Sequence, residues 1–532
     1  MLNMRAGFHR TPVFRGAILA RGLAAVALVV IYLSVPNAQP DLTNFNADDS
    51  EAYLALSYAL THGIGYTRSL TSGFYVPHTT WPPGMPLLLA PSVAWGGLPI
   101  DWMAVKATTL VLGLLGIGLA WRYLRRITGS AAAADLGALL FALAPFYWLF
   151  SRMALTEVPT VTLILAALLL MDHVWADRRP VGWQVALVGL FAGLGMLLRG
   201  TVAGLMLLPI TYMIGTRRAR APRGRLVRLA LLHMAAFCVP FIAWAARNHA
   251  VHVNGIGFDG INQFRMLFAV SPTVADSDLM TLAQIGLTAV DNLRYRIIYY
   301  ATQQMLPGLA VTDWENWPHS AVLAVALFAA LVVAIIPRRA AGWPLFLALA
   351  PSAGIMLIYA FGGAARFWVP ITSLALLLVV VNFSAEWSRL RKGIQVTTLA
   401  GVTLAYGGTL AIFATQFAAH PMVSDAADMV RVFQQAGTLN PPPAATLTEH
   451  FALFALESGA PAPPYPTSLG RDPSFTHLVN RDTTTTYAKH FDVPAGSMEL
   501  FRRGQWAIYA LPQRMRLHQL APPDDPAPTP AR

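Results

Sequence analysis

Long apolar runs recur along most of this 532-residue chain, and they restrict the folds that it can adopt. A helix needs about 20 mostly apolar residues to cross a bilayer. Only 12% of the residues are charged, against roughly 25% in a soluble domain. The sequence therefore predicts an all-α polytopic membrane protein with about 11 transmembrane helices and additional interfacial helices.

Several of the predicted spans begin or end at or beside proline or glycine. The spans cover residues 16–36, 104–121, 131–150, 157–176, 181–198, 201–216, 225–247, 319–337, 341–361, 364–383 and 394–416. The apolar stretch 81–100 is predicted to be an interfacial or re-entrant helix. Counting it as a span would move the arginines of 122–126 to the opposite side of the membrane.

Basic residues are concentrated in every second loop between these spans. Half of the 38 lysine and arginine residues lie before the first span or in alternate loops, such as 122–126 and 217–228. This bias marks cytoplasmic loops. It predicts a multi-pass protein of the cytoplasmic membrane, with the N-terminus inside and the C-terminus in the periplasm. The net charge of +12 is accounted for by these loops, so membrane lipids are predicted partners and nucleic acid is not.

Apolar density divides the chain into three parts. Residues 1–416 form the predicted transmembrane module, with large outer loops at 37–103 and 248–318. Residues 417–520 are predicted to be a small extracytoplasmic α/β domain. Within it, 425–435 has a helical pattern and 506–511 a strand pattern. Residues 521–532 are rich in proline and are predicted to be disordered.

Two outer segments carry acidic residues. Asp48 and Asp49 precede a helical stretch that includes Tyr53, and Glu157 lies in the turn after the third span. Carboxylates often do no more than stabilise a helix N-terminus, and Glu157 could be an ordinary loop residue before a proline. A carboxylate near a substrate hydroxyl can instead act as a general base. The positions at the membrane edge favour the catalytic reading when the acids are taken together.

Three arginines lie at outer span ends, against the general bias: Arg199, Arg247 and Arg366. Each alone could reach lipid headgroups. Together they predict a site for an anionic ligand, because guanidinium binds phosphate in a two-point geometry. His78 is more often a loop residue, but it could contact substrate or join the acids around a divalent metal.

These segments, in this order, resemble the C-superfamily (GT-C) glycosyltransferases that use polyprenyl-phosphate sugars. The likeness is to bacterial relatives of protein O-mannosyltransferases and of the lipid A aminoarabinose transferase. The matching motifs are Asp49 with Tyr53, Pro82–Ala90, Thr156–Pro159, Arg199-Gly200, Pro240 through Arg247-Asn248, and Arg366-Phe367 with Pro370. The last is similar to an Arg-Tyr-x-x-Pro motif that faces the lipid phosphate. Relatives more often have aspartate at the position of Glu157 and lysine at that of Arg199.

The resemblance implies an enzyme that moves a hexosyl or pentosyl group from a polyprenyl-phosphate donor to a lipid, glycan or protein acceptor, with inversion in a single displacement. Asp49, Asp48 and Glu157 would be the catalytic acids. Arg366, Arg199 and Arg247 would bind the donor phosphate, and His78 and Tyr53 would contact substrate or a metal. No nucleotide is expected, since the sequence has no glycine-rich phosphate loop.

Three other functions stay open at this stage. A transporter or lipid-linked glycan flippase would use a similar set of helices, although paired halves and broken helices at the midplane are typical of transporters. A structural membrane protein would bind a partner through its outer domain. A polymer ligase would use a diphosphate-linked lipid donor instead.

Overall fold

The computed structural model places the chain in two compact units, Met1–Asn37 and Ala38–Arg532. It describes residues 29–33, 47–68, 70, 77–96, 98–176, 180–215, 222–253, 267–270, 278–306, 308–309, 320–359, 365–418, 421–439, 446–447, 474–481, 496–503 and 506–516. In the first unit only the helical residues 29–33 are included, so most of the predicted span 16–36 lies outside the described residues. All that follows concerns the second unit.

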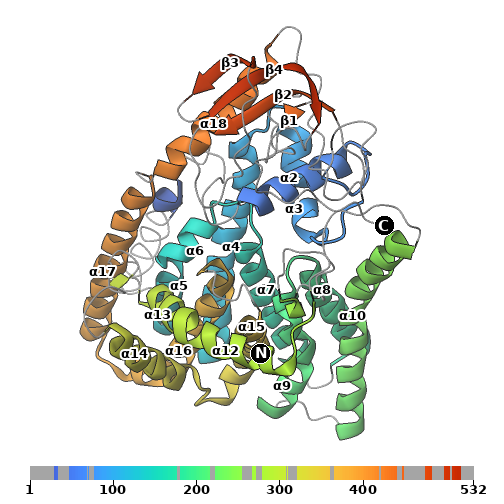
Figure 1. The fold of residues 1–532 in the computed structure, drawn as a ribbon. Coiled ribbons are helices and arrows are strands. Elements are labelled where there is room, and N and C mark those ends of the chain that lie inside the picture. Colours follow the sequence, from blue (N-terminus) through green and yellow to red (C-terminus); the bar gives the residue numbers. More distant parts are fainter. Residues whose placement is uncertain are drawn as a thin grey trace, which may run out of the picture. The chain divides into compact units, whose positions relative to one another are not determined.

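Ten predicted spans, from 104–121 to 394–416, coincide with helices (Figure 1). These elements are α4 (Trp102–Thr128), α5 (Ala131–Ala142), α6 (Pro145–Phe150), α7 (Glu157–Ala176), α8 (Gly182–Leu194), η1 (Gly195–Leu197), η2 (Gly200–Leu207), α9 (Leu208–Gly215), α10 (Arg223–Val253), α14 (Ser320–Ile335), η6 (Ala340–Gly342), α15 (Trp343–Ile358), η7 (Ala365–Trp368), α16 (Val369–Arg389) and α17 (Lys392–Ala418). Among the described residues, six helices are long and apolar enough to span a membrane, and four apolar helices are shorter. The predicted polytopic helical fold is confirmed.

The core of the bundle lies around α16 and α7. The apolar window of α16 is 89% buried and that of α7 is 72% buried, whereas that of α17 is only 6% buried. Helix α16 contacts α4, α5, α7, α14 and α15. Helix α16 is therefore apolar on all sides because it packs against other helices. Helix α17 is apolar because its exposed surface is suited to contact with lipid.

Helices α8 and α10 pack with their backbones close together. Gly189 and Gly193 lie one helical turn apart on α8, and a Cβ on either would overlap the carbonyl of His233 or Phe237 on α10. Small residues at this spacing are typical of close helix pairs in membranes. His233 extends the contact, since its Nε2 lies 3.0 Å from the Leu205 carbonyl of η2. The hairpin of α8, η1 and η2 is thereby fixed against α10.

One end of the bundle gathers the arginine-rich loops, and we name it the basic end. Arg126 at the end of α4 pairs with Asp172 at the end of α7. Arg225 donates to the Pro180 carbonyl (3.2 Å), and Arg339 donates to Ser384 (2.8 Å). Glu157 begins α7, fifteen residues before Asp172, so it lies roughly 22 Å away along the helix axis. The end that carries Glu157 is named the site end.

Shorter helices come between these long ones. They are α2 (Ala47–Thr61), α3 (Gly84–Gly96), α12 (Leu282–Asn292), the π-helical turn η3 (Leu293–Ile297) and α13 (Ile298–Met305). Helix α2 ends before Gly63, whose φ of 69° is in the left-handed region that favours glycine. Helix α3 has 13 residues and is about 20 Å long, too short for a hydrocarbon core of about 30 Å. This length agrees with the predicted interfacial helix.

The C-terminal region is a small α/β domain, as predicted. Its elements are α18 (Pro421–Gly437), β1 (Thr446–Leu447), β2 (Ser474–Arg481), β3 (Met498–Arg503) and β4 (Trp506–Arg516). The strand order is β1-β2-β4-β3, with β4 antiparallel to β2 and β3, and β1 parallel to β2. Helix α18 packs on β3 and β4 (Figure 1). Ala507 and Ile508 of β4 are fully buried. The predicted disordered tail, 521–532, lies outside the described residues.

Candidate functional site

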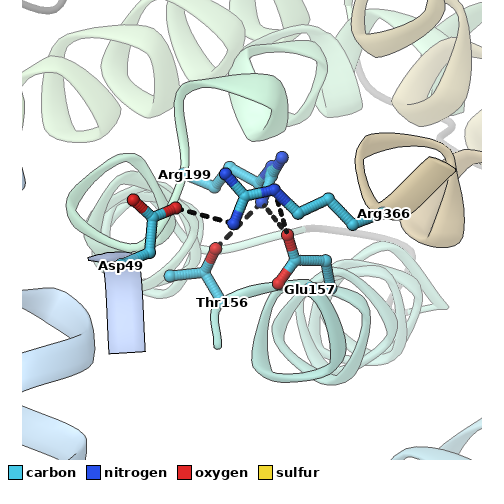
Figure 2. A network of polar contacts seen from close by, with 5 residues as sticks. All are labelled: Asp49, Thr156, Glu157, Arg199 and Arg366. Carbon is cyan, nitrogen blue, oxygen red and sulfur yellow. Dashed lines mark hydrogen bonds and ion pairs between the residues drawn. The ribbon is translucent and has the colours of Figure 1, made fainter. Parts of the chain in front are cut away.

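Two acids and two arginines from four separate segments meet at the site end (Figure 2). Asp49 is in the first turn of α2, and Glu157 is the first residue of α7. Arg199 is the residue between η1 and η2 that precedes Gly200, and Arg366 is in η7. Each acid is near a helix N-terminus, where the helix dipole stabilises negative charge. The sequence prediction had placed all four on the outer face of the membrane, and the structure brings them into contact.

The four charges are arranged as two ion pairs. Arg366 Nη1 lies 2.7 Å from Asp49 Oδ2, and Arg199 Nη1 lies 2.7 Å from Glu157 Oε1. The pairs are joined because Arg366 Nε is 4.0 Å from the same Glu157 oxygen. Arg199 also donates to the Thr156 hydroxyl at 2.9 Å, as Figure 2 shows. The network balances two negative charges with two positive ones.

Burial differs between the two acids. The Glu157 side chain is 1% exposed, whereas that of Asp49 is 17% exposed. Two buried atoms, Glu157 Oε2 and Arg366 Nε, have no hydrogen-bond partner among the described residues. Buried polar atoms normally have partners. Within this network, one acceptor and one donor are therefore not satisfied by the described protein groups.

Aromatic rings support the two guanidinium groups. The guanidinium carbons of Arg366 and Arg199 lie 4.6 Å and 4.7 Å from the centre of the same ring, that of Phe367. The Tyr359 ring packs on Phe367, with their centres 5.8 Å apart. A guanidinium over a ring gains electrostatic attraction and keeps its N–H donors free at its edge. Phe367 therefore aligns both arginines.

Tyr53 lies among all four charges. It comes one turn after Asp49 on the same face of α2 and is 5% exposed. Burial raises the pKa of Tyr53 well above its ordinary value; Asp49 and Glu157 raise this pKa further, and the two arginines oppose them. The phenol is therefore neutral at physiological pH and can donate a hydrogen bond.

The segment that carries Arg199 is held by close packing with α3. A Cβ on Gly84 would overlap the carbonyl of Leu197, two residues before Arg199. On the other side, Ser352 of α15 donates to the Thr201 carbonyl. The Pro-Pro-Gly segment at 82–84 therefore packs directly against the support of the arginine.

Arg247 and His78 belong to a second group of residues, which we name the loop clamp. Arg247 donates to the His78 carbonyl and its guanidinium lies over the rings of Tyr66 and Trp244, at 5.4 and 5.1 Å. Asn248 donates to the Thr79 carbonyl at 3.0 Å. These contacts fasten the segment before α3 to the end of α10. Arg247 was predicted beside Arg366 and Arg199, but its described contacts are those of a residue that holds this loop.

His78 is fully buried within the loop clamp. Its Nε2 accepts the Trp81 backbone N–H at 3.0 Å, and its ring stacks on Trp81. The Nε2 lone pair is thus used inside the protein and not for the predicted substrate or metal contact. Asp48 is in α2, but its side chain lies outside the described residues.

The sequence left a divalent metal possible at the acids. Within the described part of the chain, no group of three or more histidine, cysteine or acidic residues is arranged to hold one. The carboxylates of Asp49 and Glu157 both face guanidinium groups. This set of groups fits an anion better than a cation.

Comparison with known proteins finds a family match and similar solved structures. Residues 82–244, about a third of the chain, match the family of dolichyl-phosphate-mannose-protein mannosyltransferases. The crystal structure of ArnT from Cupriavidus metallidurans bound to undecaprenyl phosphate is similar, with a TM-score of 0.58 and 14% identity over 92% of this chain and 98% of that chain. The apo state of the same protein gives a TM-score of 0.58 and 15% identity over 93% and 98%. The sequence matches no curated protein.

The family match and the shared fold confirm the resemblance that the motifs indicated. The chain is a multi-span membrane protein with the fold of the GT-C glycosyltransferases. The matched range contains Glu157, Arg199 and the Pro-Pro-Gly segment. Asp49 and Arg366 lie outside that range, and they join the site through the contacts in Figure 2.

Proposed function

We propose that this protein transfers a sugar from a polyprenyl-phosphate donor to an acceptor on the outer face of the cytoplasmic membrane. One observation carries the proposal: Arg366 and Arg199 are aligned on a single ring beside a partly exposed acid, Asp49. Two guanidiniums suit a phosphate, and the acid suits proton removal from an acceptor. The likeness to a structure with bound undecaprenyl phosphate supports this choice of donor.

The charge distribution supports an outward-facing site. The arginine-rich loops gather at the basic end, which is the cytoplasmic end by the positive-inside rule. The acids and guanidiniums of the network lie at the site end. A donor with its lipid tail among the helices and its phosphate at the membrane edge would present the sugar to the periplasm.

The proposed reaction is a single displacement at the anomeric carbon. An acceptor hydroxyl or amine forms a bond to that carbon as the bond to the phosphate oxygen breaks, and the electron pair leaves on the phosphate. Arg366 and Arg199 stabilise the growing phosphate charge, which is often the largest contribution to catalysis. Asp49 takes the acceptor proton, a role worth roughly 10²- to 10⁴-fold in rate.

Glu157 has a different proposed role from Asp49, because it is buried and bonded to Arg199. It would hold Arg199 in place, and its open Oε2 would accept a hydrogen bond from the acceptor or the sugar. The donor phosphate would replace Asp49 at Arg366. Donor binding would thus free the Asp49 carboxylate, so that the base becomes available only when the donor is present.

The proposal is tested with purified protein in nanodiscs and a panel of undecaprenyl-phosphate hexoses and pentoses. Lipid, glycan and peptide fractions from cell envelopes serve as acceptors. Mass spectrometry of released undecaprenyl phosphate detects transfer whichever acceptor reacts. We expect release that depends on an acceptor fraction and is lost in Asp49→Asn. No release from any donor with any fraction would contradict the proposed function.

A further inference from the structure

Tyr359 is a second tyrosine at this site, and none of the sequence motifs marks it. It directly follows α15 and is 9% exposed. Its ring packs on Phe367, the ring that supports both guanidiniums. Tyr359 thus lies one ring away from the proposed phosphate-binding groups.

The backbone of Tyr359 is held from two directions. Its N–H donates to the Ile355 carbonyl at 3.0 Å, which closes the last turn of α15. The Asn292 side-chain amide of α12 donates to the carbonyls of Tyr359 and Leu357, at 2.8 and 2.9 Å. Asn292 is itself buried. These bonds hold the Tyr359 backbone, and the ring contact with Phe367 holds its side chain, an ordering that favours binding.

Charged groups of the network act on the Tyr359 side chain. Burial raises the pKa of Tyr359 to about 12; among the nearby charges Arg366 acts most strongly and lowers this pKa, Asp49 raises it, and Arg199 lowers it. For Tyr53 the most strongly acting charge is instead Asp49, followed by Glu157. The Tyr359 phenol is therefore neutral at physiological pH, and its ring packs on the Phe367 ring that supports both guanidiniums.

We infer that the Tyr359 hydroxyl donates a hydrogen bond to an oxygen of the lipid-linked phosphate, beside the guanidiniums of Arg366 and Arg199. The inference rests on the proposed function and names a further donor-binding group for it. A neutral phenol keeps its proton and makes short O–H···O⁻ bonds. It adds a donor without adding charge to a network that already contains two cations.

The neighbouring residue explains why this role falls to Tyr359. Phe367 occupies the second place of the Arg-Tyr-x-x-Pro-like segment and has no hydroxyl. Its ring lies under both guanidiniums, so a hydroxyl added there would enter the same set of charges. The chain therefore offers a direct relocation experiment, in which the hydroxyl is removed from one ring and added to the ring packed against it.

The test measures binding of undecaprenyl phosphate and of undecaprenol in nanodiscs by native mass spectrometry. The variants are Tyr359→Phe, Tyr359→Phe with Phe367→Tyr, and the matched control Tyr406→Phe, whose lost hydroxyl donates to the Met305 carbonyl. We expect Tyr359→Phe to weaken undecaprenyl phosphate binding by on the order of 10-fold, the size of one hydrogen bond to a charged group. Undecaprenol binding should not change, and the relocated hydroxyl should restore part of the loss.

The outcomes separate this inference from the proposed function. If the wild type transfers sugar and binds undecaprenyl phosphate, and Tyr359→Phe binds it equally well, only the inference is overturned. An equal loss in Tyr406→Phe, or an equal loss of undecaprenol binding, also overturns it, because the effect would then be structural. If the wild type neither binds the phosphate lipid nor transfers sugar, the proposed function fails and the inference fails with it.

Discussion

Arg366 lies between Asp49 and Glu157, with Nη1 2.7 Å from the Asp49 carboxylate and Nε 4.0 Å from Glu157. One guanidinium therefore links an acid on α2 to an acid on α7. In the absence of ligand its charge is neutralised mainly by Asp49. A phosphate that enters the site must compete with that carboxylate.

This competition gives Asp49→Asn two opposite effects. The transfer rate should fall by roughly 10²- to 10⁴-fold, because the proposed base is lost. Affinity for undecaprenyl phosphate should stay the same or increase, because Arg366 no longer has a carboxylate partner. Rate and binding are measured on the same nanodisc preparation. A rate close to that of the wild type, or a large loss of affinity, would contradict the assigned role.

The Asp49–Arg366 pair should also show strong coupling in stability. Arg366→Gln alone leaves Asp49 without its described ion-pair partner, at a cost of about 3–5 kcal/mol for a fully buried pair and less here, because Asp49 is partly exposed. Asp49→Asn combined with Arg366→Gln should recover most of the thermal stability. The double variant should still be inactive. Additive losses in thermal unfolding would show that the two side chains do not interact.

Glu157 and Arg199 form the more buried pair, so their coupling should be larger. Glu157→Gln and Arg199→Gln each remove the charge of one partner in the 2.7 Å ion pair. We expect the double variant to be more stable than the sum of the single losses predicts, by about 1–3 kcal/mol. Thermal unfolding of the four proteins completes the cycle. An interaction energy near zero would mean that the pair is not formed.

Gly84→Ala should disturb the site without changing any charge. The new Cβ would overlap the Leu197 carbonyl, so the segment before Arg199 must move. Stability should fall by about 1–3 kcal/mol, with a further loss of transfer activity. Gly118→Ala on α4 is the matched control, since nothing lies within 4 Å of its added Cβ. Equal changes in stability and in transfer activity for the two variants would contradict the proposal that the Pro-Pro-Gly segment supports Arg199.

Tyr359 should make stability depend on pH in alkaline solution. Its pKa is raised to about 12 in the folded protein, against about 10 in the unfolded chain. The contribution of Tyr359 to the free energy of unfolding is fully present below pH 10. It is lost as pH rises toward 12, because the unfolded chain releases the tyrosine proton first. The loss approaches about 1.4 kcal/mol per pH unit. The difference in melting temperature between wild type and Tyr359→Phe should therefore shift between pH 8 and pH 10.5. A constant difference would contradict this pKa.

Much of the fold and part of the site could be predicted from the sequence. Apolar runs and loop arginines identify the spans, because bilayer thickness and the positive-inside rule act on local sequence. The same reasoning placed Asp49, Glu157, Arg199 and Arg366 on one face of the membrane. It did not give their positions around the bundle, which depend on how helices pack. Arg247 was for this reason grouped with Arg366, although its described contacts are in the loop clamp.

The aromatic residues of the site were harder to predict. Tyr359 follows an apolar span, where an aromatic belt accounts for tyrosine equally well. Phe367 was visible only as one letter of a motif, and its place under two guanidiniums depends on the hairpin of α8, η1 and η2. The Gly189 and Gly193 spacing on α8 was a usable signal for that hairpin's packing against α10.

A structure of the protein with undecaprenyl phosphate in nanodiscs, determined by electron cryo-microscopy, tests the central claim most directly. We predict that the phosphate lies within hydrogen-bond distance of Arg366 and Arg199, with the Asp49 carboxylate separated from Arg366. A phosphate bound away from both arginines, with the Asp49–Arg366 pair intact, would contradict the account.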